Sequence, residues 1–171
     1  MDLCEIKKKL EEINPHIYLH SVSAMEEAEK LAVHYKADVE KAKIAGLLHD
    51  CGKKMTRGSD NLTHASLSAK LAREHFNIQD AEILDAIMYH TTGREDMTML
   101  DKIIFIADKI ESRRKYDKVE ELRIKAYENI DDAIVLSIES TVEYVKMRNL
   151  ELDHESLKTL EFIRRQNEKR P

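Results

Sequence analysis

The chain has 171 residues, enough for one domain with a hydrophobic core and too few for two ordinary domains. Its 4 glycines, 2 prolines and lack of tryptophan, together with many helix-forming residues, favour an all-α fold. A net charge of -5 argues against a general nucleic-acid binder. No run approaches the roughly 18 apolar residues that span a bilayer, and the amphipathic N-terminus is unlike a signal peptide, so we predict a cytoplasmic protein without a membrane partner.

The N-terminal part of the chain predicts three helices. Apolar residues at helical spacing give the first, which Asn14 and Pro15 end because the residue before a proline is pushed out of the α region. A second helix is expected over about residues 20–35. Asp38 is the expected N-cap of a third helix, from which Gly52 would exit in the left-handed conformation.

The rest of the chain continues as helices. A polar segment is expected to form a loop before a helix over about residues 64–76, and Asp80 should cap the next helix, which ends near Gly93. The helix that starts at residue 99 is apolar around most of its circumference, which indicates a central element packed on several sides. Three amphipathic helices follow, over about residues 119–129, 132–147 and 154–166.

Asp108 breaks the apolar pattern of the expected central helix. It directly follows Ile104 to Ala107, and a lone carboxylate in such a place is costly to bury. A basic partner such as Lys109, Arg113 or Arg114 would compensate its charge. A divalent cation would compensate it better.

His49 and Asp50 stand at the end of the third expected helix, directly after the apolar run AGLL. Imidazole and carboxylate together suit first-row metals, and consecutive residues at a helix end can converge on one ion. The dipeptide alone is weak evidence, because it occurs by chance in many chains. Further candidates fall at expected helix ends or in the buried helix, and the ordered set is His20, His49, Asp50, His64, His90 and Asp108. The whole set favours a metal site.

This ordered set resembles the HD-domain superfamily of metal-dependent phosphohydrolases. The surrounding sequences are similar to the YqeK family of symmetrical bis(5'-nucleosyl)-tetraphosphatases, in LHSVSAMEEAEKLAVHY, KAKIAGLLHDCGK, LTHASLSAKLA and EILDAIMYHTTGREDMTMLDKIIFIADKIESRR. The resemblance implies one compact HD-domain helical bundle over residues 1–171, with a metal-binding core at about residues 18–123 and the C-terminal helices packed on it. It also implies hydrolysis of diadenosine tetraphosphate to two ADP by a metal-activated water.

The same resemblance implies the role of each residue. His20, His49, Asp50 and Asp108 would bind a first metal ion, and His64 and His90 would complete a second site that shares Asp50. Iron is favoured, and manganese, cobalt or zinc would also suit these ligands. Asp50 and Lys53 are the expected catalytic residues. The expected substrate contacts are Lys53, His64, His90, Thr91 and Arg114.

Two other functions are compatible with the same residues. One is an HD-type phosphodiesterase or nucleotidase that acts on another nucleotide, for which the metal ligands would be the same. The other is a nucleotide-sensing module whose metal serves only structure. A homodimer is plausible, since amphipathic helices are left over after the core is built. Arg94 and Lys102 are further candidates for phosphate contacts.

Overall fold

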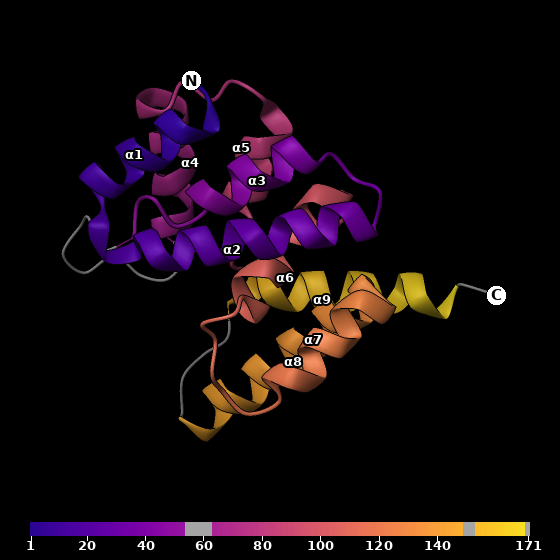
Figure 1. The fold of residues 1–171 in the computed structure, drawn as a ribbon. Helices are drawn as coiled ribbons and strands as arrows, with labels where there is room; N and C mark the ends of the chain where they lie inside the picture. Colours follow the sequence, from indigo (N-terminus) through magenta and orange to yellow (C-terminus); the bar gives the residue numbers. More distant parts are fainter. Residues whose placement is uncertain (54–62, 149–152, 170–171) are drawn as a thin grey trace.

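The computed structural model describes residues 1–53, 63–148 and 153–169, which form nine helices and no strand (Figure 1). The helices are α1 (Leu3–Ile13), α2 (Pro15–His34), α3 (Val39–Leu48), α4 (Thr63–His75), α5 (Ala81–Met88), α6 (Met99–Ile110), α7 (Val119–Glu128), α8 (Ile130–Met147) and α9 (His154–Glu168). The predicted all-α fold is therefore confirmed. None of these described helices is long and apolar enough to cross a membrane.

The two aspartates that the sequence predicts as N-caps do begin helices. The carboxylate of Asp38 accepts a hydrogen bond from the backbone N–H of Lys41. The carboxylate of Asp80 accepts from the N–H groups of Glu82 and Ile83. These bonds satisfy backbone donors that have no partner within the first helical turn.

The second helix begins earlier than the sequence analysis expects. Asn14 closes α1 with a non-helical backbone, and Pro15 is already the first residue of α2. Proline is well tolerated at this position, because the first N–H groups of a helix have no partner in any case. His20 therefore lies in the second turn of α2, and its predicted place at a helix start is wrong.

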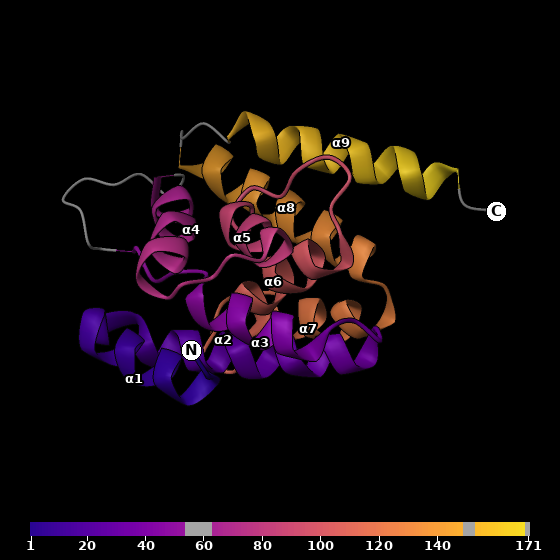
Figure 2. The same cartoon turned by 90° about the horizontal axis from the view of Figure 1, so that it is seen from above.

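Helix α6 is the central element of the fold. It packs against α2, α3, α5, α7 and α8, and Figure 2 shows it between α2 and α3 on one side and α8 on the other. Six of its apolar residues are at most 1% exposed, namely Ile103, Ile104, Phe105, Ile106, Ala107 and Ile110. Full burial of a large apolar side chain contributes roughly 1.5–3 kcal/mol. The prediction of a helix packed on several sides is confirmed.

Two glycines shape the backbone beside the residues singled out above. Gly52 does not take the left-handed conformation predicted for it; among the described glycines only Gly93 does, with φ at 69°. Gly52 is required for close packing instead, since a Cβ atom there would lie 2.8 Å from Cγ of Leu67 and 2.9 Å from N of Ser68. Its N–H donates to the hydroxyl of Ser68 at 3.0 Å. Helix α4 can therefore rest directly on the segment that follows α3.

Candidate metal centre

The ends of four helices and the second turn of a fifth meet at one place. His20 comes from α2, His49 and Asp50 directly follow α3, His64 lies in the first turn of α4, His90 follows α5, and Asp108 lies in the last turn of α6. All six residues of the ordered set are thus brought together. The side chains of His49 and Asp50 are completely buried there.

Four of these residues form a first cluster. Nε2 of His20 lies 3.1 Å from Nε2 of His49 and 3.1 Å from Oδ1 of Asp108. Nε2 of His49 lies 3.4 Å from the same Oδ1 and 3.5 Å from Oδ2 of Asp50. One ligand atom from each of the four residues lies within 4.8 Å of all the others. A single divalent cation could contact all four.

Asp50 also belongs to a second cluster, with His64 and His90. Its Oδ1 atom lies 3.1 Å from Nε2 of His64 and 3.4 Å from Nε2 of His90. These two Nε2 atoms are 3.2 Å apart. The hydroxyl oxygen of Thr91 lies 3.2 Å from Nε2 of His90. Asp50 turns Oδ2 toward the first cluster and Oδ1 toward the second, so that it can serve as a ligand in both.

Backbone carbonyls orient two of the imidazoles. Nδ1 of His49 donates to the carbonyl of Gly46 at 2.7 Å, and Nδ1 of His90 donates to that of Ile87 at 2.7 Å. Because a carbonyl only accepts, Nδ1 must carry the proton, and a neutral ring then directs the lone pair of Nε2 into the cluster. Burial lowers the pKa of His90, which favours its neutral form.

The resulting donor set fits divalent cations. In each cluster one Nε2 atom faces another at about hydrogen-bond distance. Oδ1 of Asp50 is buried and accepts no hydrogen bond of good geometry from the described residues. Neutral imidazoles and carboxylates turned toward one point are the ligands that iron, manganese, cobalt and zinc take in proteins. The residues of each cluster therefore fit a divalent cation, and Asp50 belongs to both clusters.

Glu111 is a functional candidate that the sequence analysis did not assign to the site. It is only 2% exposed, and its Oε1 atom lies 3.2 Å from Nδ1 of His20. A carboxylate behind a ligating histidine fixes the ring and makes it a better donor. The sequence spacing could have identified Glu111 as a site residue, because residues three apart, such as Asp108 and Glu111, project from the same side of a helix.

The charges of the first cluster are strongly coupled. Burial raises the pKa of Asp108, but hydrogen bonds from His20 and His49 outweigh it and hold this pKa well below its usual range. Burial lowers the pKa of His20, whereas Asp108 and Asp50 raise it by more, to about 9. When no metal ion is bound, a proton on His20 thus offsets part of the negative charge of Asp50 and Asp108. Protons and metal ions therefore compete for this cluster.

Three basic side chains surround the two clusters. Nζ of Lys53 donates to Oδ2 of Asp50 at 2.6 Å, and the guanidinium of Arg114 donates to Oδ1 of Asp108 at 2.5 Å. Both side chains are 35% exposed, so they also reach solvent. Lys109 lies 3.7 Å from Oδ2 of Asp108 and donates to the carbonyl of His90 at 3.3 Å. The expected basic partner of Asp108 exists, in addition to the clustered histidines.

Three other basic residues form hydrogen bonds or ion pairs within the fold and do not contact the two clusters. Arg123 donates to the carbonyls of Ile110, Glu111 and Arg114, and so holds the segment that follows α6. The two further candidates for phosphate contacts are engaged in ion pairs: Arg94 with Asp101 at 2.8 Å and with Asp85 at 3.0 Å, and Lys102 with the buried Asp131 at 2.7 Å.

Comparison with known proteins agrees with this geometry. The HD domain family matches residues 17–113, which is more than half of the chain and includes all six residues of the two clusters. This chain belongs to the HD-domain family. The resemblance found in the sequence motifs is thereby confirmed.

Two relatives of this HD-domain protein have the same name. The symmetrical bis(5'-nucleosyl)-tetraphosphatase of Halalkalibacterium halodurans is 34% identical, over 89% of this chain and 93% of the relative. That of Bacillus subtilis is also 34% identical, over 81% of this chain and 84% of the relative. A similar structure is that of a predicted HD superfamily hydrolase involved in NAD metabolism from Clostridium acetobutylicum. It has a TM-score of 0.90 and 32% identity, and the match covers 97% of this chain and 98% of that one.

A nuclease is similar over a shorter stretch. Ribonuclease Y of Cutibacterium acnes is 34% identical over 95 residues, which make up 56% of this chain and 17% of that enzyme.

Proposed function

We propose that this protein is a metal-dependent hydrolase that cleaves diadenosine tetraphosphate symmetrically to two ADP. The observation that carries the proposal is the pair of clusters joined by Asp50, whose two carboxylate oxygens face different sets of imidazoles. The likeness to named symmetrical tetraphosphatases over most of the chain supports the choice of substrate.

The proposed ligands are divided between the two clusters. His20, His49, Asp50 and Asp108 would hold one divalent cation, and Asp50, His64 and His90 would hold a second. When bound, such a pair would lower the pKa of a water molecule and neutralise charge on phosphoryl oxygens. We favour iron, and manganese, cobalt or zinc would also suit these nitrogen and oxygen donors.

The rim of basic side chains would position the phosphate chain. Phosphoryl transfer depends mainly on positioning and charge neutralisation, which Lys53 and Arg114 can supply because each is partly exposed and already lies against a carboxylate of the site. We assign Lys53 a catalytic role beside Asp50. The hydroxyl of Thr91, together with His64 and His90, would contact substrate at the second cluster.

The reaction breaks the central P–O–P bridge of the substrate. Water adds to one of the two inner phosphorus atoms, the bridging oxygen leaves with the other half, and each half is ADP; the proton of the water passes to solvent or to product. Lys53 is well placed to stabilise the charge on the phosphoryl oxygens, since its ammonium group lies 2.6 Å from Asp50.

The test is turnover of a panel of nucleotides with separation of the products by anion-exchange chromatography. The metal-loaded protein should convert diadenosine tetraphosphate to ADP alone. Formation of AMP and ATP, or no turnover, would reject the proposal. A short single-stranded RNA and mononucleotides belong in the panel, since the likeness to ribonuclease Y makes a phosphodiesterase the second candidate.

We propose a single HD domain over residues 1–171, a cytoplasmic location, and a nucleotide as the partner instead of nucleic acid or membrane. A homodimer is also proposed. Light scattering at several protein concentrations would measure the oligomeric state directly.

A further inference from the structure

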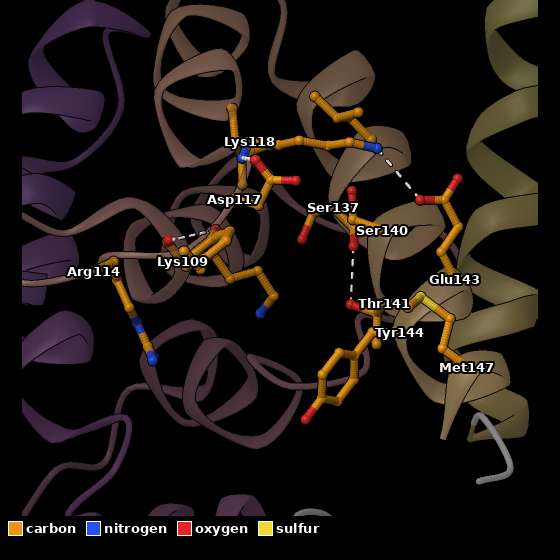
Figure 3. Close-up of a pocket in the computed structure, with 13 residues that line it drawn as sticks. Lys109, Arg114, Asp117, Lys118, Ser137, Ser140, Thr141, Glu143, Tyr144 and Met147 are labelled. Atoms are coloured by element: carbon orange, nitrogen blue, oxygen red, sulfur yellow. Dashed lines mark hydrogen bonds and ion pairs between the residues drawn. The ribbon is translucent and has the colours of Figure 1, made fainter. Parts of the chain in front are cut away.

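A cavity of about 620 Å³ lies beside the metal centre, between the end of α6, the segment that follows it, and α8 (Figure 3). Lys109 and Arg114 line it, and both also contact Asp108. In Figure 3 these two residues lie on one side of the cavity, and Tyr144 and Met147 lie on the opposite side. The cavity therefore extends away from the metal centre, starting from a positively charged end.

The walls of this cavity combine apolar surface with hydroxyl groups. Leu122 and Leu136 contribute aliphatic side chains, and Ser137, Ser140 and Thr141 contribute hydroxyls from α8. The hydroxyl of Thr141 is bound to the carbonyl of Ser137 at 2.9 Å. This mixture suits a ring system that carries a few polar groups better than it suits a lipid chain or a peptide backbone.

Exposed aromatic residues point to the same kind of ligand. Tyr116, Tyr144 and Met147 all border the cavity, and they are 44%, 53% and 86% exposed. The phenol of Tyr116 donates to the carbonyl of Lys109 at 2.8 Å, which holds its ring in place. Exposed apolar groups around a hollow mark binding sites, and aromatic rings are the usual platforms for nucleobases.

We propose that this cavity binds one nucleoside of the dinucleoside polyphosphate, with its base against Tyr144 and its phosphates passing Lys109 and Arg114 to the metal centre. This inference rests on the proposed function for the identity of the substrate. Lys109 and Arg114 contact Asp108 of the first cluster, and Tyr144 lies on the other side of the cavity, so a nucleotide could direct its phosphates toward the metal centre and its base toward Tyr144.

Calorimetric titration with ADP and with pyrophosphate tests the proposal. Pyrophosphate carries the phosphate charges of ADP without its nucleoside. Wild-type metal-loaded protein should bind ADP more tightly than pyrophosphate. Tyr144→Ala should weaken ADP binding about tenfold, within the range found for the loss of one stacked base, and should leave pyrophosphate binding unchanged.

Two further variants complete the experiment. Ser140→Trp fills the cavity and should also weaken ADP binding but not pyrophosphate binding. Leu157→Ala on α9, 40% exposed and not part of the lining, should change neither. Circular dichroism would verify that each variant is folded. Equal affinities of wild type for ADP and pyrophosphate, or unchanged ADP binding in both cavity variants, would overturn the inference.

These results can be separated from those that test the proposed function. Binding of ADP is measured without turnover, so a protein that fails to cleave diadenosine tetraphosphate still reports on the cavity. If cleavage does occur, Tyr144→Ala should raise KM for diadenosine tetraphosphate by the same factor and should leave kcat nearly unchanged.

Discussion

Glu111 and His20 form a buried pair in which a carboxylate oxygen lies 3.2 Å from Nδ1 of the imidazole. The second oxygen of Glu111 accepts a hydrogen bond from the backbone N–H of Arg113 at 2.6 Å, so the carboxylate itself is held in place. The pair links α2 to the end of α6. It turns Nε2 of His20 toward His49 and Asp108.

We expect Glu111→Gln to weaken metal binding by about 10–100-fold, the usual effect of removing the partner of a ligating histidine. Glutamine keeps the size of the side chain but lacks the charge that makes His20 a strong donor. Titration with Mn²⁺ followed by calorimetry measures the change. Glu128→Gln on α7, where the carboxylate is 61% exposed, is the matched control and should bind metal as wild type does. If Glu111→Gln bound Mn²⁺ as tightly as Glu128→Gln does, Glu111 would have no role in orienting His20.

Removal of a histidine from the second cluster should lower the metal content. His64→Ala and His90→Ala each leave the four residues of the first cluster in place. We expect the content to fall from about two ions per chain to about one, as measured by plasma mass spectrometry on protein purified at a fixed metal concentration. Undiminished content in both variants would refute the two-ion assignment.

Asp50→Asn should be more severe than either histidine variant, because Asp50 faces both clusters. Activity should fall by more than the roughly 100-fold typical of changes around a metal site. The same substitution also leaves Lys53 without its charged partner. Initial rates across a range of metal concentrations would show whether added metal restores activity, and full restoration would contradict the assignment of Asp50 as a shared ligand.

Metal should stabilise the folded protein. A cation present at 100 times its dissociation constant, and bound only by the folded state, adds about 2.7 kcal/mol to the free energy of unfolding. For a chain of this size the melting temperature should rise by roughly 5–10 °C. Scanning calorimetry before and after treatment with a chelator measures the shift. Asp50→Asn should respond far less, and an equal response would place the bound metal elsewhere.

Gly93→Ala should destabilise the turn that follows His90. Gly93 has φ at 69°, and a Cβ atom there would lie 2.6 Å from Cγ2 of Thr159 on α9. The loss should be roughly 1–3 kcal/mol, the usual cost of a strained backbone residue. Urea denaturation measures it. Ser112→Ala, at an exposed position, should have almost no effect, and a comparable loss there would mean that local packing does not explain the result.

The two cysteines should differ in reactivity. Cys4 is exposed, whereas Cys51 is completely buried and donates its thiol to the carbonyl of Ser68. Burial raises the pKa of Cys51 to about 12, so very little reactive thiolate forms near neutral pH. Native protein treated with iodoacetamide should be labelled at Cys4 only, as mass spectrometry of peptides would show. Rapid labelling of Cys51 would mean that the segment after α3 opens easily.

Much of the helical framework could be predicted from local sequence. The caps at Asp38 and Asp80 and the boundary at Asn14 depend on neighbouring residues, so the chain reveals them directly. The central position of α6 also followed from its apolar residues. The left-handed turn predicted at Gly52 is wrong, because a glycine can provide either such a turn or room for another backbone. Only the position of α4 distinguishes these two roles.

By itself, the sequence determined the types of ligand and their order along the chain, since histidines and aspartates at the ends of apolar helices are visible in the residues. The tertiary structure decided which nitrogen of each ring faces the cluster, that Asp50 lies between two sets of imidazoles, and that Glu111 stands behind His20. These relationships join residues that are as many as 91 positions apart. Distances between such residues depend on how whole helices pack, and helical periodicity specifies only neighbours within a few turns.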